Sequence, residues 1–512
     1  MQNLSGYFSI QKSYKMIIVV VLVFFQAGGF LSFTAAPPLA GGHQTSGTIH
    51  MEYLDFIKSK QIRADDAGFN IELSDINKNA FEWQKLLIKW SIMKGKCANF
   101  QECGLGKTIQ QLCFADETRK YTGKPSIILA PLAVANQTKM QGEKFGIDVN
   151  ICESQKDVTN NAVNITNYEK LHNFDCSVFG SVVLDESSIL KNNTGKTRTQ
   201  LIETFKFTPF KGCYTATPSP NDFMELGNHS EFLGVMSYFE MLATFFVHDG
   251  GNVSQWRLKG HAESAFWDWV SSWACVVTNP SILGYNDERY NLPPLNVKQV
   301  TVKSELQDDS GQMLLFPEET QTLQERAKAR RDSTEDRVKK TCEIANSTDE
   351  QILVWCDYNK ESELLKKNIS GAVEVKGSDS DEHKRNAMLG FANGDIRVLV
   401  SKPSICGYGM NWQNCNNEIF VGLSDSFEKY YQAIRRCWRF GQEKPVNAYI
   451  VVSEAEGAVK DNIEKKQQQA QKFMAELAER TKKKLLTDIH RTTKMITTYK
   501  PKERMTLPQW IV

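Results

Sequence analysis

Two series of short apolar runs, each ending in polar or small residues, dominate the pattern of the chain. The first follows residue 124 and contains SIILAPL, DVNIC, AVNITNY, SVVLDES and GCYTATPSP. The second begins after residue 350 with QILVWCDY, AVEVKG, DIRVLVS, NEIFVGL and VNAYIVV. Continuous apolar runs are typical of strands buried on both faces, as in a parallel sheet covered by helices. The pattern therefore predicts an α/β protein with two parallel-sheet domains in tandem.

An aromatic stretch between the two series follows a different period. Apolar side chains recur at helical spacing in the segment AESAFWDWVSSW: Phe266, Trp267, Trp269, Val270 and Trp273. Such a stripe is more often the buried face of a helix than a surface for stacking nucleic-acid bases. We expect a helix packed on the first domain.

These patterns divide the chain into five parts. We expect a hydrophobic N-terminal extension at 1–50, a first lobe at 51–221, an aromatic-rich helical insertion and linker at 222–345, a second lobe at 346–453 and a helical tail at 454–512. The tail has the period of a long amphipathic helix. Its lysines favour a solvated face over nucleic-acid contact.

The net charge and the cysteine positions limit how the chain can bind nucleic acid and whether it forms disulfides. The 512 residues carry a net charge of +1, so a nucleic-acid partner would have to be bound by a local basic surface. Twelve cysteines are scattered through apolar runs with no C-x-x-C pair, which indicates buried, reduced thiols. Because histidines do not cluster near them, we expect no structural zinc.

The N-terminus conflicts with a cytoplasmic protein. Residues 16–33 carry no charge and are followed by the small residues TAAPPLAGG, as in a signal peptide or a marginal membrane span. Three interpretations stay open: a membrane tether, an export signal, or an upstream extension outside the working protein. We favour the extension, with Met51 as the start and the tether second. We expect a cytoplasmic location, and a membrane partner only if the segment is real.

The stretch QECGLGKTIQ, residues 101–110, has the composition of a phosphate-binding loop. Gly104 and Gly106 would let backbone N–H groups converge on an anion. Lys107 would add a charge for the β and γ phosphates, and the Thr108 hydroxyl is a common ligand of phosphate-bound Mg²⁺. Gln101 stands where the G-x-x-x-x-G-K-[ST] consensus has its first glycine, so a Gly-rich turn with a chance lysine is the alternative.

The run VVLDESSIL supplies two carboxylates at the end of an expected buried strand. Asp185 suits the Mg²⁺ ion, directly or through water. Glu186 suits a general base that orients and deprotonates an attacking water. Both lie where ligands are bound in parallel sheets, at the carboxyl ends of strands.

Two further motifs complete the candidate chemistry. YTATPSPN places Thr215 and Thr217 after an apolar run, either to sense the phosphate state or simply in a turn. YYQAIRRCWRFGQ places Arg436 and Arg439 three residues apart on an expected helix. They could stabilise charge on a transferring phosphoryl group or form structural salt bridges, and the motif alone leaves these alternatives even.

In this order and spacing, ECGLGKT, DESS, TATP and QAIRRCWRFGQ resemble motifs I, II, III and VI of superfamily-two helicases. The last resembles the Swi/Snf-type translocase branch, and the whole is similar to phage-encoded DEAD/DEAH-box-like helicases. The resemblance covers about residues 51–512. It implies a P-loop NTPase of two RecA-like lobes with helical insertions and a C-terminal helix, binding ATP and Mg²⁺ in the cleft.

The resemblance also assigns residues outside these four motifs. Gln84 matches a glutamine that reads adenine, and Gln432 and Gly409 would bind the nucleotide. Pro131, Asn167, Tyr168 and Asn411 fall in motifs that grip nucleic acid or couple it to the nucleotide, the last beside Gly407 and Gly409. The chain departs from the family pattern at Gln101, Ser187, Ser188 and Arg435, which leaves the substrate preference open.

The function implied is that of a nucleic-acid-stimulated ATPase, a DNA helicase or translocase, with RNA as the alternative nucleic acid. A duplex translocase that does not separate strands is the nearest rival. A nucleotide-gated nucleic-acid-binding assembly factor is the rival from another class, and intact Lys107 and Glu186 argue against it.

Overall fold

The computed structural model describes residues 64–131, 134–248, 256–286, 288–303, 323–406, 411–424, 426–454 and 457–490. The expected N-terminal extension, Met51, Gly407 and Gly409 lie outside the described residues. No helix among those described has the length and apolar character needed to cross a membrane.

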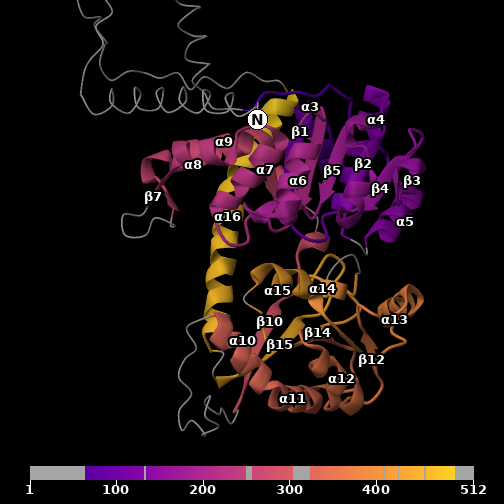
Figure 1. Cartoon of the computed structure of the whole chain (residues 1–512), viewed down its shortest axis with the longest axis vertical. Helices are drawn as coiled ribbons and strands as arrows, with labels where there is room; N and C mark the ends of the chain where they lie inside the picture. Colours follow the sequence, from indigo (N-terminus) through magenta and orange to yellow (C-terminus); the bar gives the residue numbers. More distant parts are fainter. Residues whose placement is uncertain are drawn as a thin grey trace, which may run out of the picture. The chain divides into compact units, whose positions relative to one another are not determined.

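The first lobe is built on a parallel sheet of the order β3-β4-β2-β5-β6-β1-β9 (Figure 1). Its strands are β1 (Lys96–Gln101), β2 (Ser126–Ala130), β3 (Val149–Ile151), β4 (Val163–Asn167), β5 (Ser181–Asp185), β6 (Phe210–Thr215) and β9 (Ala274–Val277). Every residue of β2, β4, β6 and β9 is buried. This is the double-sided burial that the continuous apolar runs predict.

Helices cover both faces of the first sheet, and each face has its own apolar core. They are α3 (Glu82–Lys94), α4 (Lys107–Thr122), α5 (Ala135–Phe145), α6 (Lys196–Thr204), α7 (Leu226–Leu233), α8 (Tyr238–Phe245) and α9 (Glu263–Trp273). The aromatic stripe of α9 is buried in one of these cores, with Trp273 fully buried and Trp267 2% exposed. The prediction of a core helix is confirmed, and base stacking by this stripe is excluded.

The second lobe has a parallel sheet of the order β10-β15-β14-β11-β13-β12. Its strands are β10 (Leu295–Val302), β11 (Ile352–Trp355), β12 (Ala372–Val375), β13 (Val398–Ser401), β14 (Asn417–Val421) and β15 (Val446–Ser453). Its helices are α10 (Leu323–Asp332), α11 (Thr334–Asn346), α12 (Asn359–Asn368), α13 (Asp381–Asn393), α14 (Pro403–Cys406) and α15 (Phe427–Ile434). The prediction of two parallel-sheet lobes in tandem is confirmed.

The segment expected as insertion and linker, 222–345, contributes to both lobes. Its strand β9 pairs with β1, and its strand β10 pairs with β15. A small antiparallel hairpin, β7 (Phe246–His248) and β8 (Trp256–Leu258), lies between α8 and α9 in the chain.

Within the expected tail, the described residues 457–490 form one long helix, α16 (Gly457–His490), as the amphipathic period predicts. Phe473 and Leu477 are buried in a core of the first lobe, whereas Ala470 packs against a core of the second lobe. The Thr481 hydroxyl accepts a hydrogen bond of 2.9 Å from the backbone N–H of Val276 in β9. The helix therefore links the two lobes through side chains along one face.

All twelve cysteines are free thiols, and eleven are buried, as the sequence predicts. Cys103, in the loop after β1, is the partly exposed one.

The strand order sets the position of the candidate site. In the first sheet β6 lies between β5 and β1, so the loops that follow these three strands leave the sheet side by side. Phe100 of β1 is level with Thr215 of β6, and Asp185 of β5 is level with Tyr214. Three motifs that are far apart in the sequence therefore meet at one edge of the sheet.

Candidate active site

The loop between β1 and α4 has the strand, turn and helix context of a phosphate-binding loop. Gly104 and Gly106 have φ angles of 89° and 72°, which favour glycine, and α4 begins at Lys107. The Lys107 amine donates hydrogen bonds to the backbone carbonyls of Gln101, at 3.0 Å, and Glu102, at 3.4 Å. The lysine thus lies over its own loop at the N-terminus of a helix, where anions are favoured.

Gln101, the departure from the glycine consensus, has a structural role. Its side chain is fully buried and forms a reciprocal amide pair with Gln110, with N–H···O distances of 2.6 and 2.8 Å. The pair ties the end of β1 to the first turns of α4. A side chain that points into the core leaves the phosphate side of the loop open, so the departure does not disturb the loop.

Gln84 packs directly beneath the loop. Its amide donates to the Leu105 carbonyl at 3.0 Å and accepts from the backbone N–H of Phe81 at 3.0 Å. A Cβ atom added at Gly106 would lie 2.5 Å from the Gln84 amide nitrogen. Gln84 therefore supports the loop, and only glycine fits at position 106.

Asp185 is held by residues of two other elements. Gln111, one turn after Lys107 on α4, donates to an Asp185 carboxylate oxygen at 2.6 Å. The Tyr168 hydroxyl donates to the Asp185 backbone carbonyl at 2.7 Å. Burial raises the pKa of Asp185, and the bond from Gln111 and the charge of Lys107 act in the opposite direction. The carboxylate is thus held by α4, the helix that begins at the phosphate loop.

Glu186 has a backbone conformation that is rare for its residue type. Its φ of 52° is the one positive φ among non-glycine residues of the described part of the chain. Thr215 donates its hydroxyl to a Glu186 carboxylate oxygen at 3.3 Å. Burial raises the pKa of Glu186 to about 7, against the charges of Lys107 and Arg436. Strained backbone and a shifted carboxyl pKa are both typical of functional positions.

The prediction that Arg436 and Arg439 lie on a helix is wrong. α15 ends at Ile434, and both arginines lie in the turns that follow it. The Arg436 carbonyl accepts a hydrogen bond of 2.9 Å from the backbone N–H of Trp412, a distant partner that replaces the next bond of a continuing helix. The arginines are therefore oriented by tertiary contacts rather than by helical spacing.

Arg436 nevertheless acts on the carboxylates of the first lobe. Its charge lowers the pKa of both Asp185 and Glu186 against the larger effect of burial. Its side chain is 5% exposed, and its Nε donates to the Gln432 carbonyl at 3.2 Å. Burial and the neighbouring Arg436 charge lower the pKa of Arg439 to about 9. The two guanidinium groups thus lie close enough to repel each other in a partly buried site.

Polar side chains also join the lobes directly. Ser188 donates its hydroxyl to Glu428 of α15 at 2.5 Å, and Lys191 forms an ion pair with the same carboxylate. Glu102 of the phosphate loop accepts a hydrogen bond from Arg435 at 2.7 Å and another from Tyr431. Glu102 follows β1 directly, and Ser188 and Lys191 lie in the helical turn Ser187–Lys191 after β5.

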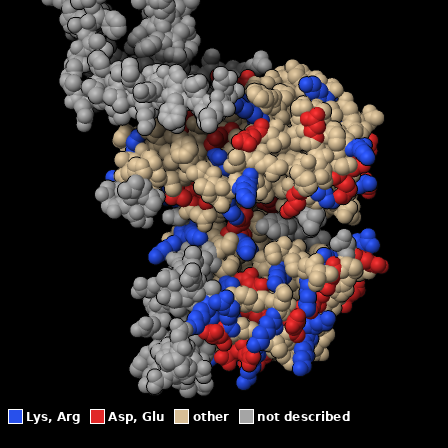
Figure 2. Space-filling view, in the orientation of Figure 1, with Lys and Arg blue, Asp and Glu red and all other residues tan. Residues whose placement is uncertain are grey.

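The residues predicted to contact nucleic acid are not gathered at one place. Pro131 directly follows β2, and Asn167 is the last residue of the neighbouring strand β4, level with Ala130 in the sheet. Asn411 is exposed on the second lobe, and Thr217 is buried after β6. On the face shown in Figure 2, Lys and Arg over the second lobe alternate with Asp and Glu, so charge alone marks no nucleic-acid surface there.

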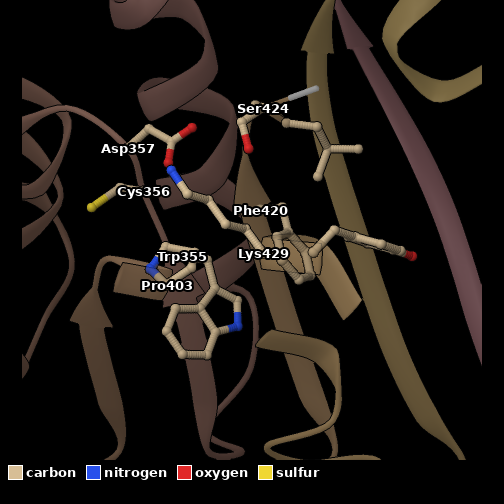
Figure 3. Close-up of a pocket in the computed structure, with 10 residues that line it drawn as sticks. Trp355, Cys356, Asp357, Pro403, Phe420, Ser424 and Lys429 are labelled. Atoms are coloured by element: carbon tan, nitrogen blue, oxygen red, sulfur yellow. The ribbon is translucent and has the colours of Figure 1, made fainter. Parts of the chain in front are cut away.

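A small pocket lies at the carboxyl ends of β11 and β14 in the second lobe (Figure 3). Trp355, Asp357 and Phe420 line it, and its volume is about 10 Å³. That is room for roughly one water molecule. The pocket is therefore too small for a nucleotide, and it forms no part of the candidate site.

The residues at the phosphate loop fit a nucleoside triphosphate with Mg²⁺. The lysine and the N–H groups of the helix N-terminus suit phosphate oxygens. The carboxylate, next to a turn that carries threonine, suits a hard cation. The buried amide nitrogen of Gln432 has no hydrogen-bond partner among the described residues, so a polar donor stays available beside the arginines. Nucleotide binding by Gln432 stays a prediction.

Sequence reasoning missed several contacts of this site. Gln111 follows Lys107 by one helical turn, a spacing that could have indicated its approach to the same ligand. Glu102, Tyr431 and Glu428 gave no local signal, because each of their partners lies in the other lobe.

Comparison with known proteins places a family match in the second lobe. Residues 336–441 match the family model of the helicase conserved C-terminal domain. The chain is also similar to the bifunctional helicase and thymine dioxygenase JBP2 of Leishmania major, at 28% identity over 144 residues, and to that of Leishmania braziliensis, at 29% over 112. These alignments cover 27% and 21% of this chain but 13% and 10% of the relatives, so they span a small part of those longer proteins.

Two solved structures align with most of this chain. The Sulfolobus solfataricus SWI2/SNF2 ATPase core in complex with dsDNA aligns with a TM-score of 0.39 at 16% identity, covering 83% of this chain and 99% of that one. S. cerevisiae Dbp5 bound to RNA and ADP BeF3 aligns with a TM-score of 0.47 at 13% identity, covering 72% and 83%. Both TM-scores are below 0.5, too low for these alignments to assign the fold. The two-lobed fold is shown by the two parallel sheets of this chain. The helicase family match covers the segment that carries both Arg436 and Arg439.

Proposed function

We propose that this chain is a nucleic-acid-stimulated ATPase, a helicase or translocase that moves along DNA. The observation that carries the proposal is the approach of the second-lobe segment holding Arg436 to the phosphate loop, where Arg435 donates to Glu102 at 2.7 Å. The Arg436 charge in addition lowers the pKa of Asp185 and Glu186 in the first lobe. The charge of Lys107 in the phosphate loop also lowers the pKa of both carboxylates. A site completed by groups from two lobes can couple its chemistry to lobe movement.

The residues have separate roles in this proposal. Lys107 and the glycines of its loop bind phosphate, while Thr108 and Asp185 hold Mg²⁺, with Gln111 orienting the carboxylate. Mg²⁺, when bound, neutralises phosphate charge. Glu186 accepts a proton from the attacking water, for which a pKa of about 7 is well matched. Arg436 and Arg439 stabilise negative charge on the terminal phosphate oxygens.

The nucleic-acid partner rests on the family match rather than on the geometry. The second lobe matches the helicase conserved C-terminal domain, and the curated relatives are named helicases. Pro131, Asn167 and Asn411 are proposed to contact the backbone of the nucleic acid, with Thr215 and Thr217 coupling that contact to Glu186. Contacts to phosphates would make movement independent of sequence and sensitive to salt.

ATP hydrolysis by the purified chain, with single-stranded DNA, duplex DNA, forked DNA or RNA, tests the proposal. We expect DNA to raise the rate, and Lys107→Ala to lower it by about 100-fold or more because a charge on the phosphates is lost. The circular dichroism spectrum of this variant should match that of the parent chain. A strand-displacement assay separates a helicase from a duplex translocase.

Several outcomes would count against this proposal. Equal hydrolysis with and without nucleic acid, combined with nucleotide-dependent binding of DNA, would favour the assembly factor. Near-normal stimulated hydrolysis by Lys107→Ala would remove the phosphate loop from the mechanism. Greater stimulation by RNA than by DNA would change the substrate and leave the ATPase assignment in place.

A further inference from the structure

Glu102, directly after β1, is bound by two side chains of the second lobe. The Tyr431 hydroxyl and an Arg435 guanidinium nitrogen both donate to the same carboxylate oxygen, Oε2, the latter at 2.7 Å. Arg435 donates in addition to the Cys103 backbone carbonyl at 3.3 Å. The phosphate loop is thus held at two consecutive residues by α15 and the turn after it.

The second-lobe side of this contact is rigid. Arg435 is 5% exposed, and its guanidinium lies over the rings of Trp438, at 4.9 Å, and Tyr431, at 5.6 Å. The Trp438 ring nitrogen donates to the Pro293 carbonyl at 2.7 Å. Burial raises the pKa of Tyr431, so its hydroxyl stays protonated and donates. Little side-chain entropy then opposes the contact with Glu102.

The same segment meets the loop a second time at Phe440, one residue after Arg439. A Cβ atom added at Gly104 would lie 3.1 Å from Phe440 Cβ and 3.2 Å from the Phe440 nitrogen. The segment 431–440 therefore touches the loop at both of its ends. Arg436 and Arg439 lie within it.

The lobes are less closely packed beside this contact. A cavity of about 330 Å³ is lined by Glu102, Tyr431 and Arg435 together with the turn after β6 and residues of α16. Because this space is open, close packing does not fix the distance from α15 to the first lobe on this side. The polar contacts of Glu102 then have a large share in setting it.

We propose that Glu102 is a positioning residue, which through Tyr431 and Arg435 holds the segment that carries Arg436 and Arg439 against the phosphate loop. This inference rests on the proposed function, because the arginines have a catalytic task only if the site hydrolyses a nucleotide. The Glu102 carboxylate is engaged by Tyr431 and Arg435, so it acts through these residues. Its loss leaves a buried guanidinium without its carboxylate, an unfavourable state that moves the segment away.

The test combines Glu102→Gln and Tyr431→Phe with a distance measurement between the lobes. Tyr431→Phe removes one hydroxyl and keeps the ring under Arg435, so folding is expected to survive. Tyr449→Phe is the matched control, because it also removes one tyrosine hydroxyl from the second lobe, in β15. Fluorophores attached through unnatural amino acids at the exposed positions 124 and 366 report lobe separation by energy transfer in the full chain without nucleotide.

We expect each variant to broaden or lower the energy transfer, to lower kcat of DNA-stimulated hydrolysis about 10-fold, and to leave KM for ATP within about 2-fold. The double variant should be no worse than the poorer single variant, because both changes break one contact. Glu102→Asp should restore part of kcat. Tyr449→Phe should behave as the parent chain.

The outcomes separate the two proposals. Unchanged energy transfer and kcat in a chain that hydrolyses ATP would overturn the positioning role alone. Additive losses, or a loss expressed only in KM, would also overturn it. If the parent chain hydrolyses no ATP, the proposed function fails, and the energy-transfer change alone then decides whether Glu102 holds the second lobe.

Discussion

Gln111 donates a hydrogen bond of 2.6 Å to the carboxylate of Asp185, joining the helix that follows the phosphate loop to the strand that precedes Glu186. The bond fixes one oxygen of a partly buried carboxylate and favours its charged form. In the proposed site this carboxylate holds Mg²⁺. Gln111 therefore orients a metal ligand without touching the metal itself.

Gln111→Ala is expected to raise the Mg²⁺ concentration that half-saturates hydrolysis by about 10-fold, the usual cost of losing the partner of a metal ligand. The maximal rate at saturating Mg²⁺ should change less. A titration of stimulated hydrolysis with Mg²⁺ at fixed ATP measures both. A fall in the maximal rate with no change in the Mg²⁺ requirement would assign Gln111 another role.

The pKa of Glu186 predicts a pH dependence. Burial raises it from 4.5 to about 7, and a general base must be unprotonated to accept a proton. Hydrolysis should therefore fall as the pH is lowered through about 7, seen as an acidic limb in kcat/KM. Glu186→Gln should retain nucleotide binding and lose this limb together with most of the rate.

Thr215→Val is a second test of the assignment of the acidic limb to Glu186. It removes a hydroxyl that donates to the Glu186 carboxylate at 3.3 Å and so stabilises its charged form. The acidic limb should move to higher pH, while the rate above the limb stays similar. A limb that stays in place in both variants would assign the titration to another group.

How much of this site could be predicted depends on how local each signal is. The residues of each strand and loop were recognisable because burial on both faces and glycine-rich turns leave a pattern within a few residues. Lys107 and Glu186 were named for this reason. The meeting of their loops at one sheet edge follows from strand order, which the sequence did not contain in any single segment.

The features that the sequence did not predict depend on contacts between residues that are far apart in the chain. The helix expected at Arg436 ends at Ile434, and the Arg436 carbonyl accepts a hydrogen bond from the N–H of Trp412, a contact outside any local pattern. Ser188 and Glu428 are 240 residues apart, and neither carries a signal that it will find the other. Contacts between segments that are distant in the sequence, within a lobe and between the lobes, are therefore the part of the site that required the structure.

Arg436→Ala should lower kcat by about 1,000-fold if its guanidinium stabilises the transferring phosphoryl group, with a smaller effect on the KM for ATP. Arg436→Lys should restore little, because an ammonium cannot form the same planar set of hydrogen bonds. The acidic limb from Glu186 should also move to higher pH, since a positive charge that lowers this pKa is gone. A change confined to KM would make Arg436 a binding residue.

Gly104→Ala tests the close approach of the two lobes with a matched control. Gly104 and Gly123 have φ angles of 89° and 65°, so alanine strains the backbone at both positions by roughly 1–2 kcal/mol. A new Cβ at Gly104 meets Phe440 at 3.1 Å, whereas one at Gly123 meets no atom within 4 Å. Thermal unfolding should therefore show a loss of stability in both variants, with a larger loss in Gly104→Ala because of the close contact with Phe440. Only Gly104→Ala should lower kcat, because it pushes the arginine segment away from the phosphate loop. Equal kcat in the two variants would show that hydrolysis does not need the loop and Phe440 to touch.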